Sequence, residues 1–213
     1  DEASGAIKKV EQELGNVSRA MKKPRAASES MAVSVAKGTA AYDLIQKSVS
    51  KAIDFFVDCA KESMESSRIM AQVENNVKNA GFAFDTLNPK IKEYSENAIQ
   101  LGFDDETAAE SLSKLLLVTK DYGQAQALTN LAMDLARAKN VDLATATKQV
   151  TLATQGNVKE LKLLGIDLDE TATTAENLQK MQEQLKGSAV EFAKTAAGQY
   201  ATLREEASNL KQK

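Results

Sequence analysis

A seven-residue repeat of apolar side chains runs through the first half of this chain, from Ala3 to Leu101. Counted in alternating steps of four and three residues, every position of the repeat is apolar apart from five: Pro24, Ser28, Gly38, Ser63 and Ser66. A chain that is 43% hydrophobic overall would leave more than half of such positions polar by chance. Because an undistorted helix drifts off a strict seven-residue stripe within a few turns, the repeat predicts long helices that supercoil in the left-handed sense.

The apolar seam formed by this repeat is wider than that of a two-stranded coiled coil. Further apolar residues, among them Leu44, Ile53 and Phe55, flank it and broaden the stripe. A single straight helix cannot hide such a stripe from water, so the seam must pack against copies of itself, later helices of the chain or a partner. We interpret it as a self-association surface of more than two strands. Its central positions are Ile45, Val49, Ala52, Phe56, Met70, Val73 and Val77.

Two prolines are expected to divide this helical rod, which we take as a first domain over residues 1–101. Pro24, in the basic run of residues 22–25, predicts a joint between helices because proline lacks a backbone donor and clashes with the preceding turn. Pro89 predicts a second joint, with Asn88 as a helix cap and Pro89 at the first helical position. The basic run is too short to indicate a nucleic-acid patch.

Single glycines separate short helical stretches after residue 101, which predicts a packet of short helices over residues 102–173. Asp142 is expected to cap a helix over residues 143–154, and Asn157 to cap a brief helix that follows it. The glycines are expected to end helices in the left-handed conformation. They are Gly102, Gly123, Gly156, Gly165 and Gly187.

A last long helix is predicted from Thr174 to the end, as a third region over residues 174–213. Its apolar stripe is formed by Leu178, Leu185, Ala189, Phe192, Ala196, Leu203 and Leu210. The chain holds only two prolines, and alternation of apolar and polar residues is hard to find. The predicted fold class is therefore all-α: long heptad-patterned helices in a coiled coil or bundle, then a packet of short helices and a final long helix.

Histidine is absent from the chain, and cysteine occurs once. The commonest general base and metal ligand is therefore missing, which excludes zinc sites and Ser-His or Cys-His nucleophiles within this chain. The one thiol, Cys59, falls on the apolar seam and is expected to be buried and inert. No glycine-rich phosphate loop occurs. We expect neither enzymatic activity nor a cofactor.

Two acidic clusters have a simpler interpretation than chemistry. Asp104, Asp105 and Glu106 could be paired carboxylates for acid–base catalysis, but the N-terminus of a helix, where negative charge is favourable, explains all three. Residues 167–170 resemble the start of a calcium loop but lack its glycine and its distal glutamate. We expect the second cluster to be a solvated loop.

Charge and hydropathy indicate no membrane or nucleic-acid role for this segment. The net charge of −3 provides no overall attraction to nucleic acid or to anionic lipid. No apolar run approaches the roughly 20 residues that cross a bilayer. The chain begins at Asp1 without methionine or a signal peptide, so we expect a piece of a longer or processed protein.

Five short motifs follow one another over residues 98–205. They are LTNLAMDLA (128–136), NVDLATA with TLATQGN (140–157), LKLLGIDL (161–168), KGSA (186–189) and TAAGQYATL (195–203). In order and spacing they resemble the tape measure proteins of long-tailed phages and phage-like tails. The sequence departs from the family pattern at Gln199 and Tyr200, where Trp or Leu is frequent. It also lacks the hydrophobic membrane-active stretch that such proteins often carry.

The resemblance implies a structural virion component rather than a catalyst. A helix rises about 1.5 Å per residue, so a helical rod converts chain length into physical length. Tape measure proteins set tail length in this way, as an internal ruler. The resemblance further implies a few copies in the tail lumen, assembly in the host cytoplasm, contacts with tail tube and tail tip proteins, and exit ahead of the DNA during genome ejection.

Two other classes of protein are weighed against this one. A cellular coiled-coil or helical-bundle interaction module would share the heptads, but it gives no reason for ordered, glycine-punctuated motifs after residue 120. A membrane-acting helical toxin or pore former would need a long apolar hairpin, which this sequence lacks.

Overall fold

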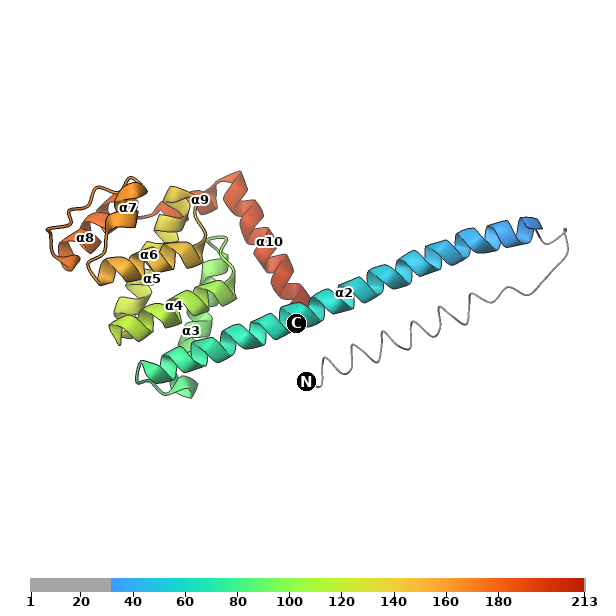
Figure 1. Ribbon diagram of the computed structural model, residues 1–213, viewed down its shortest axis with the longest axis horizontal. Helices are drawn as coiled ribbons and strands as arrows, with labels where there is room; N and C mark the ends of the chain where they lie inside the picture. The colour runs from blue at the N-terminus through green and yellow to red at the C-terminus, as the bar shows by residue number, and fades with distance from the viewer. Residues whose placement is uncertain (1–31, 213) are drawn as a thin grey trace. The chain divides into compact units, whose positions relative to one another are not determined.

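The computed structural model describes the backbone of residues 32–212 and the side chains of residues 50, 51, 54, 57, 58 and 61–209. Within this part of the chain every regular element is a helix and no strand occurs, which confirms the predicted all-α class. The helices are α2 (Ala32–Asn79), α3 (Phe84–Ile99), α4 (Asp105–Thr119), α5 (Tyr122–Lys139), α6 (Leu143–Thr154), α7 (Lys159–Leu163), α8 (Thr174–Leu185), α9 (Ser188–Lys194) and α10 (Ala196–Gln212) (Figure 1). The joint predicted at Pro24 lies outside the described residues.

The contacts divide the chain into two units that join inside α2, between residues 64 and 65. In the first unit the structure describes one stretch of helix, residues 32–64. The second unit holds the last turns of α2 and all later helices. The division predicted at residue 101 therefore does not follow the packing, because the end of α2 and all of α3 belong with the short helices.

A tight turn at Gly81 ends α2. Gly81 adopts a φ of +95°, a left-handed conformation that glycine reaches without steric cost. Its N–H donates to the carbonyl of Lys78 at 3.0 Å, and the N–H of Phe82 donates to the carbonyl of Val77 at 3.1 Å. These bonds satisfy carbonyls that the end of a helix leaves without intrahelical partners. The heptad repeat therefore does not continue along one helix to residue 101.

Asn88 and Pro89 lie inside α3, so the joint predicted there is wrong. A proline inside a helix removes a backbone hydrogen bond and costs about 3 kcal/mol. Leu87 and Ile91 of the same helix are buried, and burial of each contributes about 1.5 to 3 kcal/mol. Packing of these two side chains offsets the proline, and α3 continues through it.

Aspartate side chains cap the starts of α4, α5 and α6. The carboxylates of Asp104 and Asp142, both predicted as helix starts, accept the N–H of the residue three positions on at 2.7 Å. Asp121 makes the same contact for α5, also at 2.7 Å. The bounds of α6 agree with the predicted residues 143–154. Capping therefore locates these helix starts from local sequence alone.

Four of the five glycines predicted to end helices have a positive φ: Gly102, Gly156, Gly165 and Gly187. The prediction for Gly123 is wrong, because this residue lies in the first turn of α5. Lys120 takes the left-handed conformation at the end of α4 instead, with a φ of 54°. Its N–H donates to the carbonyl of Leu116 at 2.8 Å, so the hydrogen bond expected of a C-cap forms without a glycine.

The predicted final long helix is wrong, since residues 174–212 form three helices. Gly187, with a φ of +85°, separates α8 from α9. Thr195 has an extended backbone and separates α9 from α10. Its hydroxyl accepts the N–H of Gly198 at 3.0 Å, as an N-cap does. A continuous apolar stripe in the sequence does not reveal such breaks, because each lasts only one or two residues.

Helix α5 is central in the second unit, where it packs against α4, α6, α8 and α9 (Figure 1). The core around it is aliphatic, as the low aromatic content predicts. Its largest fully buried side chains are Val73, Val77, Ile91, Leu112, Leu115, Leu116, Met133, Leu135, Val150, Val158, Leu161 and Met181.

Candidate functional site

Asp134, in the LAMDLA run of α5, binds the start of α9. Its carboxylate accepts the N–H of Gly187 at 3.1 Å and the N–H of Ala189 at 2.9 Å. These donors stand at a helix N-terminus, where negative charge is stabilising. The side chain therefore caps a helix that lies 53 to 55 residues further along the chain. Two of the five motifs meet in this contact.

Arg137 lies three residues after Asp134 in α5 and joins this helix to the turn after α3. Its Nη2 donates to the carbonyls of Leu101 at 3.1 Å and Gly102 at 2.6 Å. Its guanidinium carbon lies 3.9 Å from the ring centroid of Phe103 and 4.2 Å from that of Phe192. Burial lowers the pKa of Arg137 from its ordinary value, and the charge of Glu205 opposes that effect.

The start of the TAAGQYATL motif, Thr195 to Gly198, packs tightly against α9. A Cβ on Gly198 would lie 2.1 Å from the carbonyl oxygen of Phe192, so only glycine fits there. The hydroxyl of Thr195 donates to the same carbonyl at 2.7 Å. Threonine therefore caps α10, and glycine lets α10 begin close against the end of α9.

Gly102, in the turn after α3, packs closely against α5 and α10. A Cβ on Gly102 would lie 2.9 Å from the Cβ of Ala201 in α10 and 3.2 Å from Nη2 of Arg137. We call the residues that meet here the motif junction: Gly102, Asp134, Arg137, Gly187 and Gly198. Elements distant in the sequence converge on it, namely the turn after α3 with α5, α9 and α10.

Other motif residues hold the turns around α7. The side chain of Asn157 accepts the N–H of Lys159 at 3.4 Å, a long contact at the position where a cap was predicted. The residue directly before α7 is Val158, which offers no side-chain cap. Lys139 donates from Nζ to the carbonyl of Gly165 at 3.3 Å.

The last turns of α2 pack into the second unit rather than onto another copy. Val73 and Val77 are completely buried within this single chain, so their assignment to a self-association seam is wrong. Met70 is half-buried. The other predicted seam residues lie on α2, with side chains outside the described ones: Ile45, Val49, Ala52 and Phe56. The seam therefore turns inward near its end, where later helices of the chain cover it.

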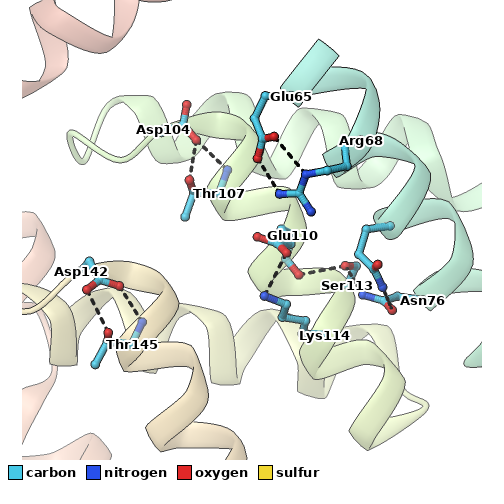
Figure 2. Close-up of polar contacts among 11 residues, drawn as sticks. Glu65, Arg68, Asn76, Asp104, Thr107, Glu110, Ser113, Lys114, Asp142 and Thr145 are labelled. Atoms are coloured by element: carbon cyan, nitrogen blue, oxygen red, sulfur yellow. Dashed lines mark hydrogen bonds and ion pairs between the residues drawn. The ribbon is translucent and has the colours of Figure 1, made fainter. Parts of the chain in front are cut away.

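A buried polar contact accompanies these valines and joins α2 to α4 (Figure 2). Asn76 donates from Nδ2 to the hydroxyl of Ser113 at 3.0 Å, and Gln72 donates to the side-chain oxygen of Asn76 at 3.0 Å. An unpaired buried amide is costly, so the contact favours one register of α2 on α4. Sequence reasoning missed it, since neither residue stands out in the heptad pattern.

Carboxylates gather where α4 begins and α10 passes. Burial, followed by the charge of Asp104, raises the pKa of Asp105. Burial also raises the pKa of Glu106, against a hydrogen bond with Ser66. Burial, followed by the charge of Asp104, raises the pKa of Glu205 in α10. Asp104 itself caps α4, as the helix-start interpretation predicted (Figure 2).

The second acidic cluster is an exposed loop, as predicted. Asp167, Asp169 and Glu170 lie between α7 and α8 and are exposed, and Asp169 accepts the N–H of Thr171 at 2.8 Å. Among the described residues, no group of three or more histidine, cysteine or acidic side chains is placed to hold a metal ion. Cys59 lies on α2, with a side chain outside the described ones.

Searches of known protein families, curated proteins and solved structures find no match to this chain. Over the described residues, none of the helices combines the length and the apolar character needed to span a bilayer. The described residues form a long heptad-patterned helix and a packed unit organised around the motif junction.

Sequence reasoning identified the motifs that form the junction but not how they connect. Asp134, Gly187 and Gly198 all stood in motifs, yet nothing in their spacing indicated which of them touch. Arg137 and Phe103 were not singled out at all, and Phe192 was placed only on the apolar stripe of the predicted last helix. An arginine three residues after an aspartate, on one face of the predicted helix, was the one available signal.

Proposed function

We propose that this chain is a structural part of a phage or phage-like tail and belongs to its tape measure protein. One observation carries the proposal: α2 runs for 48 residues through a seven-residue apolar repeat. At 1.5 Å per residue this helix is about 72 Å long. A helix of that length supplies what a molecular ruler needs, a physical length proportional to a number of residues.

The motif junction supports the proposal independently of α2. Residues of three of the five motifs, Asp134, Gly187 and Gly198, meet in one packed arrangement with Gly102 and Arg137, so these three motifs belong to one structural unit.

In this role the first part of α2 self-associates through its seam, in more than two strands, inside the tail tube. Tail tube and tail tip proteins assemble around it in the host cytoplasm, and the chain leaves the tube ahead of the DNA. Residues that fall in the packed unit form a compact helical segment of the ruler. No catalytic step and no cofactor form part of the proposal.

Changing the length of α2 in the encoding phage or tail particle tests the proposal. Deletion of residues 43–56 removes two heptads, keeps the phase of the repeat and shortens a helix by about 21 Å. A ruler then gives tails shorter by about that length, and duplication of the same residues gives tails longer by the same amount. Electron microscopy of purified tails measures both changes.

A flexible Gly-Ser insert of equal length after Ala172 is the matched control. This position lies in the loop between α7 and α8, so the insert adds residues without adding helical rise. Tail length is expected to stay unchanged in this control. Tails of normal length from both the deletion and the duplication would contradict the ruler function.

A cellular coiled-coil or helical-bundle interaction module remains the second candidate, because the heptads of α2 fit it equally well. Mass spectrometry of purified particles separates the two. A tape measure segment is recovered with tail tube and tail tip proteins, whereas a cellular module is not.

A further inference from the structure

Helix α10 packs on the second unit through small and polar residues. Ala201 lies close to Gly102, and Glu205 lies near Asp104 and Asp105. The half-buried residues of α10, among those described, are Ala201, Thr202, Glu205, Ser208 and Asn209. Large apolar side chains therefore do not hold this helix in place, at least over residues 196–209.

The opposite face of α10 presents large apolar side chains to solvent. Tyr200 is 71% exposed and Leu203 is 62% exposed, while Ala196 and Ala207 are also exposed. These residues, which we call the α10 seam, follow one another in steps of four, three and four. Leu210 continues the spacing in the sequence, with a side chain outside the described ones. A surface helix ordinarily buries its apolar stripe, so α10 has its faces reversed.

This spacing is that of the a and d positions of a coiled coil. With Leu203 at d, Arg204 and Lys211 occupy e positions, and Glu206 occupies a g position. In a parallel pair of helices, the g residue of one copy faces the e residue five positions later in the other. Glu206 therefore faces a lysine, at position 211, in a parallel second copy of α10.

An antiparallel pair would bring like charges together. Its e positions would face e positions, which places Arg204 and Lys211 against each other across the two copies. Its g positions would face g positions, which places Glu206 near its own equivalent. Like charges in register are destabilising, so the charge pattern selects the parallel order.

We propose that the α10 seam is the docking surface for α10 of a second copy of this chain, in a parallel, in-register pair. The seam is short, whereas a stable dimer interface ordinarily buries roughly 1,200 Å² or more. Association is therefore concentration-dependent, and it strengthens where another contact holds copies close together.

Disulfide trapping in the full chain tests the pairing directly. In a Cys59→Ser background, Tyr200→Cys or Ala207→Cys supplies the one thiol. A parallel, in-register pair brings the two copies of either position within disulfide reach, so each variant forms cross-linked dimers by itself under mild oxidation. Leu163→Cys, at an exposed apolar position of α7 outside the seam, is the matched control for random collision.

Each result decides the proposal. Dimers from both seam variants, at least fivefold above the Leu163→Cys level, support it. Dimers no more abundant than in that control overturn it, and the face then serves another partner or none. Dimers that form only when the two seam variants are mixed would indicate an antiparallel pair and overturn the parallel order. Association through α2 would raise the local concentration of copies in the seam variants and in Leu163→Cys alike, so the comparison with that control isolates the contribution of α10.

A charge exchange tests the register. Added to Tyr200→Cys, either Glu206→Lys or Lys211→Glu places like charges across the pair, and each is expected to reduce cross-linked dimer at least threefold. The two changes combined restore opposite charges and are expected to return the yield to within twofold of the starting variant. A combined variant that cross-links no better than the single ones would contradict the parallel register. Recovery also excludes misfolding as the cause of the single losses.

Discussion

Arg137 illustrates at the residue scale how one side chain can hold several elements together. Its planar guanidinium lies over the rings of Phe103 and Phe192 while Nη2 donates to the carbonyls of Leu101 and Gly102. A lysine carries the same charge but has no planar group that stacks on two rings and reaches the carbonyls at once. The junction therefore needs arginine for its shape as much as for its charge.

We expect Arg137→Lys to destabilise the protein by about 2 kcal/mol, because it loses stacking on two rings and leaves a backbone carbonyl poorly paired. Urea unfolding followed by circular dichroism measures this change. Arg68→Lys is the matched control, since Arg68 is exposed and pairs with Glu65 on its own helix, and a much smaller loss is expected there. Equal losses in the two variants would contradict the role given to Arg137.

We expect replacement of glycine by alanine to have opposite effects at Gly123 in α5 and Gly198 in α10. Gly198→Ala forces a Cβ to within 2.1 Å of the carbonyl oxygen of Phe192, so α10 must move away from α9. We expect a loss of more than about 2 kcal/mol. Gly123→Ala places its Cβ in ordinary contact, 3.4 Å from Asp121, and is expected to stabilise α5 by about 0.5 kcal/mol. Thermal unfolding of the two variants measures the difference, and two shifts of the same sign would refute it.

At the scale of elements, α10 is held by a contact that becomes more favourable in acid. Glu205 faces Asp104 and Asp105 of α4, with Arg204 and Arg137 as the nearby cations. Burial and the two aspartates raise the pKa of Glu205 above its ordinary value of 4.5. Its ionised form is therefore penalised in the folded state above the raised pKa. Stability increases as pH falls through that pKa towards 4.5.

Glu205→Gln keeps the shape of the side chain and removes the charge, so we expect it to stabilise the protein at pH 7. The gain stays below about 0.5 kcal/mol, because Glu205 is only half-buried and solvent screens its charge. It is expected to shrink as pH falls towards 4.5, where wild-type Glu205 becomes neutral as well. Glu96→Gln, at an exposed carboxylate of α3, is the matched control for removal of one negative charge. Unfolding midpoints between pH 4.5 and pH 7.5 measure both, and a gain that grows in acid would reverse the assignment.

On the scale of the whole molecule, the heptad repeat serves two different purposes. Val73 and Val77, near the end of α2, are buried in the core of the second unit. Earlier positions such as Val49 are assigned to a self-association seam by the sequence alone. One helix thus belongs to both units of the chain.

The same substitution at these two places should therefore have different consequences. Val77→Asp buries an unpaired charge and is expected to cost several kcal/mol, enough to abolish cooperative unfolding of the second unit. Val49→Asp is expected to leave that unfolding transition unchanged and to reduce association in sedimentation experiments. Calorimetry and sedimentation on both variants check the pair. Loss of the transition in Val49→Asp, or its survival in Val77→Asp, would contradict this division.

Local sequence was sufficient to predict helix starts and ends wherever a few neighbouring residues determine the cap. Asp104 and Asp142 cap helices where they were predicted, and four glycines adopt the left-handed conformation. The absence of strands from residues 32–212 followed equally from composition and periodicity. The predictions at Gly123 and Pro89 were wrong because competing local signals lie close by: Lys120 ends α4 before Gly123, and packing of Leu87 and Ile91 carries α3 through Pro89.

The sequence by itself thus determined the all-helical class, several helix ends and the motifs, because these depend on hydrogen bonds and side-chain periodicity within one or two turns. Only the tertiary structure decided that Asp134 caps α9, that Arg137 closes the turn after α3, and that the seam enters the chain's own core at Val73. These contacts join residues dozens of positions apart, and their energies depend on burial and distance in space, which spacing along a chain does not contain.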